Sequence, residues 1–166
     1  KDGTIVIATT YSASSEADCE YPLYVASMML GHVAADPVRE HNLYEKQVNQ
    51  LKCISSIAQR AAEAGVVTVF HPNSGENSIF RYESDYHIMF DTLYSKGIGY
   101  APDAGHMLNG GIDPLKVIRE HRDIVQHVHF KDMTPDHVWA TMGEGIGDFK
   151  SIVDFLADTG YQGWIM

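Results

Sequence analysis

Three residues that can ligate a metal ion stand at the ends of successive apolar runs. His71 ends the run VVTVFH, Asp103 follows IGYAP, and His129 lies near the end of IVQHVHF. Neutral imidazole and carboxylate are the groups that a borderline divalent ion binds in proteins. The pattern therefore predicts a site for a divalent ion (Mn, Co, Zn, Mg or Fe), with a coordination position left open for substrate or water.

Each of these residues, taken alone, also fits a structural role. His71 is compatible with a buried structural histidine, and Asp103 with a turn or helix-cap aspartate. His127 and His129 alternate around Val128, so they share one face of a strand. Two inward histidines are hard to explain by packing, because buried imidazoles need hydrogen-bond partners. We expect His129, nearer the C-terminal rim, to be the ligand and His127 to be a hydrogen-bonded residue deeper in the interior.

Further polar residues follow the same strand ends and are candidates for contact with a substrate. His106 and Lys131 are the candidates for catalysis and substrate binding, with Lys131 able to neutralise negative charge on a bound molecule. A salt bridge to Asp132 is the structural alternative for Lys131. Asn73 can donate to or accept from a hydroxyl group of a bound molecule. Glu144, between two glycines, either faces the site or lies in a solvated loop.

Apolar runs and helical patterns alternate along the chain in the order that builds a parallel sheet. Strands are predicted at residues 4–9, 66–71, 98–101, 124–130 and 163–166, helices at residues 43–64, 84–95, 113–122 and 148–157, and loops at residues 10–18, 102–111 and 131–147. Units of this size occur in doubly wound sheets and in (β/α)8 TIM barrels. No Gly-x-Gly-x-x-Gly motif follows a predicted strand, so a dinucleotide-binding crevice has no support.

The position of the polar residues favours the barrel, because TIM barrels carry their chemistry at the C-terminal ends of the strands. A complete barrel needs about 250 residues, so five predicted strands correspond to roughly strands four to eight. We expect residues 1–166 to form a single incomplete α/β TIM-barrel domain, truncated at both ends. Exposed strand edges would leave self-association as a homo-oligomer open. We expect the isolated piece to be aggregated or molten and to have no isomerase activity.

Composition excludes several classes of protein. The chain has 166 residues, of which 45% are hydrophobic and 20% charged, an ordinary globular mixture that excludes disorder. No apolar run is long enough to span a membrane. A net charge of −10 argues against a nucleic-acid partner. Cys19 and Cys53 form no disulfide framework, which predicts reduced thiols in a cytoplasmic protein.

Five segments together resemble the sugar phosphate isomerase/epimerase family, also called the xylose isomerase-like TIM barrel. They are HPNSGENSIFR, APDAGHMLNGGIDP, HVHFKD, MGEGIGDF and GYQGWIM, spread from about Leu51 to Met166. The resemblance implies that His71, Asp103 and His129 bind a divalent metal. It also implies a fourth ligand, a glutamate, just after Met166.

The resemblance further implies the reaction class. The family includes ketose 3-epimerases, inosose isomerases and inosose dehydratases, so we expect isomerisation or epimerisation of a sugar, sugar phosphate or inosose. The expected step is proton abstraction next to a carbonyl, through a metal-stabilised enediolate. The alternatives are an inosose-type dehydratase on the same site, an endonuclease IV-like AP endonuclease disfavoured by the negative charge, and an inactive fragment. Two departures from relatives are Asn73 in place of histidine and Arg81-Tyr82 in place of Glu-Thr.

Overall fold

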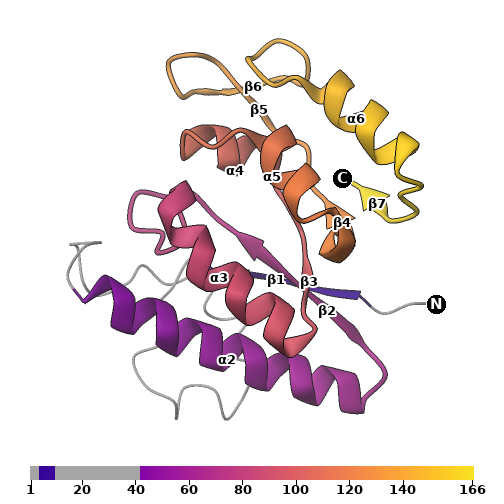
Figure 1. Cartoon of the computed structure of the whole chain (residues 1–166). Helices are drawn as coiled ribbons and strands as arrows, with labels where there is room; N and C mark the ends of the chain where they lie inside the picture. Colours follow the sequence, from indigo (N-terminus) through magenta and orange to yellow (C-terminus); the bar gives the residue numbers. More distant parts are fainter. Residues whose placement is uncertain (1–3, 10–41) are drawn as a thin grey trace.

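The computed structural model describes residues 4–9 and 42–166 (Figure 1). The predictions for Cys19 and for the loop at residues 10–18 lie outside the described residues. For the first strand, residues 4–9, the backbone alone is described.

Five parallel strands form the spine of the fold in chain order. They are β1 (Thr4–Thr9), β2 (Val67–Pro72), β3 (Gly99–Tyr100), β4 (His127–Val128) and β7 (Trp164–Ile165). β1 pairs with β2, β2 with β3, and β4 with β7. Parallel bridges between Tyr100 and Val125 and between Asp103 and His129 join β3 to β4. This succession confirms the predicted partial (β/α)8 arrangement.

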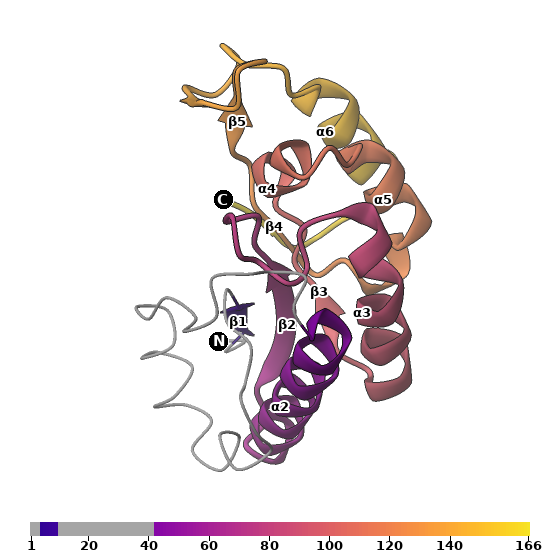
Figure 2. The same cartoon turned by 90° about the vertical axis from the view of Figure 1, so that its left-hand side faces the viewer.

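Helices cover one side of the strands (Figure 2). They are α2 (Leu43–Glu63), α3 (Glu83–Lys96), α5 (Pro114–Glu120) and α6 (Phe149–Asp158). Their ends follow the predicted capping residues: the Asp113 carboxylate accepts from the backbone of α5, and the Asp148 carboxylate accepts from Ser151. Gly97 ends α3 with a φ of 64°, a left-handed conformation that favours glycine. These four helices lie within a few residues of their predicted bounds.

Two segments predicted as loops contain regular structure, and the strands β3, β4 and β7 are each shorter than predicted. Residues 102–111 hold α4 (Ala104–Asn109), and residues 131–147 hold an antiparallel pair, β5 (Asp132–Met133) and β6 (Trp139–Ala140). A 3₁₀ turn, Arg122–Ile124, replaces the start of the predicted strand at residues 124–130. These elements are two to six residues long, too short to show a hydrophobic period.

A glycine explains how α4 fits where it does. A Cβ on Gly105 would lie 2.6 Å from the carbonyl oxygen of Lys131, in the segment that follows β4. Gly105 therefore lets the helix backbone approach the next strand end closely, and the buried Met107 anchors the helix to the core. Glycine lowers helix propensity, which is why the sequence pattern concealed this helix.

The hydrophobic core lies between the strands and their helices. Its fully buried members include Phe70, Tyr100 and Val128 from three successive strands, Met89 and Leu93 from α3, and Ile118 from α5. Because successive residues of a strand face opposite sides, His71 faces away from the helices that cover Phe70. The core therefore fixes which side of the strands carries the polar residues. Among the described helices, none is long and apolar enough to cross a membrane.

Candidate metal centre

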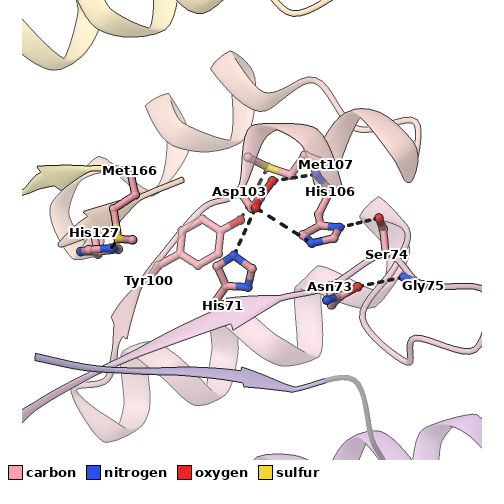
Figure 3. A network of polar contacts seen from close by, with 10 residues as sticks. All are labelled: His71, Asn73, Ser74, Gly75, Tyr100, Asp103, His106, Met107, His127 and Met166. Atoms are coloured by element: carbon pink, nitrogen blue, oxygen red, sulfur yellow. Dashed lines mark hydrogen bonds and ion pairs between the residues drawn. The ribbon is translucent and has the colours of Figure 1, made fainter. Parts of the chain in front are cut away.

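His71, Asp103 and His129 converge at the C-terminal ends of β2, β3 and β4. One possible ligand atom from each of the three lies within 4.8 Å of the others. The Nε2 atom of His71 lies 3.3 Å from Oδ2 of Asp103 (Figure 3), and the rings of His71 and His129 have centroids 4.5 Å apart. The structure thus brings together the three residues that the sequence predicts as ligands.

The donor set of this cluster fits a divalent ion. His71 and Asp103 are buried, and His129 is partly buried. Nε2 of His129 is a buried ring nitrogen without a hydrogen-bond partner, as is Nδ1 of His71. Leaving such atoms unpaired costs free energy, whereas coordination of a cation by Nε2 of His129 would satisfy that atom. Two imidazoles and a carboxylate suit a borderline divalent ion.

The protonation states of the cluster also suit a cation. Burial and the neighbouring His71 lower the pKa of His129 to about 4. Burial alone would raise the pKa of Asp103, but hydrogen bonds and charge from His71 and His106 hold that pKa below its usual value. At neutral pH the centre therefore offers a neutral His129 imidazole and an ionised carboxylate.

The two carboxylate oxygens of Asp103 make different contacts. Its Oδ1 accepts from the backbone N–H of His106 at 2.9 Å and caps α4, while Oδ2 faces His71. The helix-cap role and the ligand position, weighed as alternatives in the sequence, are compatible in the same carboxylate. The cap fixes the carboxylate orientation relative to the histidines.

His127 lies beside this cluster without belonging to it. The residue is buried, its ring centroid lies 4.9 Å from that of His129, and its Nε2 lies 3.1 Å from the sulfur of Met166. This placement agrees with the expected interior position of His127. The different effects of the two histidines on metal binding stay a prediction.

A polar recess with a volume of about 620 Å³ lies next to the cluster. Its lining includes Asn73, His106 and Lys131, three of the residues predicted to contact substrate. Glu144 does not line this recess, and its side chain is exposed. The predicted substrate contact of Glu144 therefore has no support, because the loop after β6 turns it toward solvent.

Six lining residues were not predicted as site residues: Ser74, Gly75, Glu76, Arg81, Asn109 and Trp139. In the sequence, Arg81 stands out only as a departure from relatives. Trp139 gave no signal, because it lies on the unpredicted strand β6. Ser74 and Asn109 are common surface residue types, and only the packing of their segments turns them inward.

Lys131 is oriented by an aromatic ring and not by a carboxylate. Its Nζ lies 3.6 Å from the centroid of the Trp139 ring, and this ring also meets His106 edge-on at 5.5 Å. Among the ion pairs of the described residues, none joins Lys131 to Asp132. The salt-bridge alternative for Lys131 is therefore wrong.

Asp132 instead anchors the loop that follows β6. Its carboxylate accepts from the backbone N–H groups of Met133, Gly143, Gly145 and Gly147 at 2.9–3.0 Å. Burial acts to raise the pKa of Asp132, but these four donors outweigh it and lower the pKa below its usual value. A Cβ on Gly145 would lie 2.3 Å from this carboxylate, so glycine is required at that contact.

A second, larger hollow of about 1050 Å³ lies between α2 and α3. Its lining includes Thr68, Lys52 and Gln126 but none of the predicted site residues. This hollow therefore contains none of the candidate chemistry, and His71, Asp103 and His129 lie outside it.

Comparison with known proteins identifies a family and named relatives. The family model for xylose isomerase-like TIM barrels matches residues 17–166. An inosose dehydratase of Lacticaseibacillus casei is 29% identical over 131 residues, which cover 68% of this chain and 43% of that protein. The rhizopine catabolism protein MocC of Rhizobium meliloti is 31% identical over 134 residues, covering 68% of this chain and 39% of that protein. The chain thus spans less than half the length of these relatives.

Solved structures share the fold. A D-tagatose 3-epimerase-like protein superposes with a TM-score of 0.69 at 19% identity, over 98% of this chain and 54% of the other. The probable 3-DHS dehydratase AsbF of Bacillus anthracis gives 0.62 at 15% identity, over 99% and 69%. The IolI protein, whose structure contains zinc, gives 0.66 at 10% identity, over 99% and 66%. At these identities the likeness concerns the fold.

Proposed function

The chain belongs to the xylose isomerase-like TIM barrel family, and on that premise we propose that the whole protein is a metal-dependent isomerase or epimerase. Its substrate would be a sugar, a sugar phosphate or an inosose, and its reaction would begin with proton abstraction next to a carbonyl. The observation that carries this proposal is the convergence of His71, Asp103 and His129 within 4.8 Å, beside a polar recess.

In this proposal the three converging residues hold the metal ion. When bound, a divalent ion acts as a Lewis acid that polarises a substrate oxygen. Asp103 supplies the negative charge of the site, and its role as cap of α4 keeps that charge in place. The low pKa of His129 keeps its imidazole available as a neutral donor at neutral pH.

The recess residues would bind and orient the substrate. Lys131, held against Trp139, can neutralise negative charge that develops on a substrate oxygen. His106 lies between the cluster and the recess, where it can hydrogen-bond to the same substrate. Asn73 adds an amide for a sugar hydroxyl. Proton abstraction also needs a base, which the resemblance assigns to a glutamate after Met166.

A dehydratase is the second candidate function, favoured by the relatives named inosose dehydratase. Removal of a proton next to a carbonyl leaves an electron pair that either accepts a proton again, at the same carbon from the opposite face or at another carbon, or expels a hydroxyl group from the neighbouring carbon. The first outcome is isomerisation or epimerisation, and the second is loss of water. Both begin with the same abstraction and use the same residues.

The test uses the whole natural protein, freed of metal by a chelator and reloaded with one divalent ion at a time. Incubation with ketoses, their phosphates and inososes in deuterated water, followed by NMR of the products, separates deuterium exchange with isomerisation from loss of water. We expect metal-dependent turnover that disappears in His71→Ala. Turnover that is unaffected by chelation, or cleavage of DNA at abasic sites in place of sugar conversion, would overturn the proposal.

A further inference from the structure

A chain of hydrogen bonds holds His106 from the side opposite the metal cluster. Oγ of Ser74 lies 2.9 Å from Nδ1 of His106 (Figure 3). The side-chain amide nitrogen of Asn109 lies 2.9 Å from the same Oγ and 3.0 Å from the backbone carbonyl oxygen of Ser74. Ser74 is 2% exposed, so water has little access to its hydroxyl group.

The direction of these hydrogen bonds follows from the chemistry of the groups. The carbonyl oxygen of Ser74 can only accept, so the part of Asn109 that faces it must be the NH₂ group. The second N–H of Asn109 then donates to Oγ of Ser74. A serine hydroxyl has one proton and can accept two hydrogen bonds. Among the described residues, the partners of Oγ are Asn109, which donates to it, and Nδ1 of His106. The buried hydroxyl proton therefore has an acceptor when it is directed to Nδ1 of His106.

We propose that Ser74 and Asn109 are positioning residues that fix the tautomer of His106. Because Nδ1 accepts from Ser74, the proton of the neutral imidazole resides on Nε2. This Nε2 lies 4.0 Å from Oδ2 of Asp103, on the side of the metal cluster. His106 therefore presents an N–H donor to the site and no ring lone pair. Resting on the proposed function, this makes His106 a hydrogen-bond donor to a substrate oxygen.

Tight packing holds together the two segments that carry these hydrogen bonds. Ser74 lies in the loop after β2, and Asn109 ends α4. A Cβ on Gly110 would lie 2.0 Å from the carbonyl oxygen of Arg81, so the end of α4 lies against the far end of that same loop. The series of hydrogen bonds ends at His137, whose Nδ1 lies 3.1 Å from Oδ1 of Asn109. The amide orientation deduced from Ser74 leaves Oδ1 free to accept from His137.

The tautomer is measurable without any turnover. In the whole protein with ¹⁵N-labelled histidine, two-bond ¹H–¹⁵N correlations distinguish a ring nitrogen that carries a proton from one that does not. The His106 signals are assigned by their absence in His106→Gln. We expect a protonated Nε2 and an unprotonated Nδ1 in the unsubstituted protein. A proton on Nδ1, whether alone or together with one on Nε2, overturns the proposal.

An isosteric substitution should reverse the direction of these hydrogen bonds. In Asn109→Asp the carboxylate can only accept, so it takes the hydroxyl proton of Ser74, and Oγ of Ser74 must then accept from Nδ1–H of His106. We expect the tautomer to switch and turnover to fall by about 10–100-fold through kcat more than KM, a loss typical of partners that orient site residues. Asn77→Asp, the same change in the loop that carries Ser74 and outside the recess, is the matched control and should retain both tautomer and turnover.

Ser74→Ala provides a second variant in case Asn109→Asp does not fold. Without the hydroxyl, neither tautomer is enforced, and we expect His106 to populate both. An unchanged tautomer in Ser74→Ala or in a folded Asn109→Asp overturns the proposal. Absence of metal-dependent turnover in a protein whose His106 shows the expected tautomer would instead count against the proposed function alone.

Discussion

The three-residue cluster and the recess beside it are built in different ways. His71, Asp103 and His129 leave neighbouring parallel strands, and the backbone bridge between Asp103 and His129 sets their spacing directly. The recess is lined by side chains from loops and short elements, such as His106 on α4 and Trp139 on β6. Strand pairing fixes the first region, whereas side-chain contacts and close glycine packing fix the second.

This difference predicts separate modes of failure. Changes in the cluster should remove the metal ion while the strands remain paired. Changes in the recess should leave metal content intact and lower turnover. Changes to the loop held by Asp132 should mainly alter the stability of the protein, because this loop belongs neither to the cluster nor to the recess.

The largest effect is expected from His129→Ala. It removes one of three converging donors. We therefore expect elemental analysis of the purified whole protein to find no bound metal, and we expect turnover to be abolished. His127→Ala is the matched change two residues earlier on the same strand face. It should retain the metal and lower the melting temperature, and equal metal loss in both variants would contradict the separation of the two histidines.

A smaller loss is expected from Lys131→Met. This change keeps most of the aliphatic length against Trp139 but removes the charge, so we expect turnover to fall on the order of 100-fold. Metal content should not change. Lys131→Arg, which restores the charge, should recover part of the activity. Loss of metal in Lys131→Met would show that the recess and the cluster are one unit.

Asp132→Asn should reduce stability and its dependence on pH. Four backbone donors face the carboxylate, and replacing a charged acceptor by an amide should cost about 1.5–3 kcal/mol of unfolding free energy. Because the pKa of Asp132 is lowered in the folded state, its contribution is present above the unfolded value of about 3.9 and is lost as pH falls through the folded value.

Denaturant melts at neutral pH and below about pH 4 measure this effect. The unsubstituted protein should lose more stability on acidification than Asp132→Asn does. Parallel pH profiles for the two proteins would show that the four hydrogen bonds do not favour the ionised carboxylate.

The smallest effect is expected from Glu144→Gln. The side chain is exposed and away from the recess, so stability should change by less than about 0.5 kcal/mol and turnover should stay the same. Steady-state kinetics with the substrate identified for the protein check this. A marked rise in KM would return Glu144 to the substrate site and show that the loop after β6 closes over the recess.

The amino-acid sequence by itself determined the features that depend on neighbours along the chain. The alternation of apolar runs with helical patterns indicated the βα order, and Asp113, Asp148 and Gly97 marked helix ends through their own backbone preferences. The candidate ligands could also be identified from the sequence, because residues at the ends of successive parallel strands meet at one edge of the sheet.

Only the tertiary structure decided the rest of the site. The helix α4 depends on the close approach of Gly105 to Lys131, and Trp139 depends on a pairing of two-residue strands. Asp132, adjacent to Lys131 in the sequence, binds instead the N–H groups of a loop eleven to fifteen residues further on. Such contacts join residues far apart in the chain through hydrogen bonds and close packing, for which neither hydrophobic period nor capping preference carries a signal.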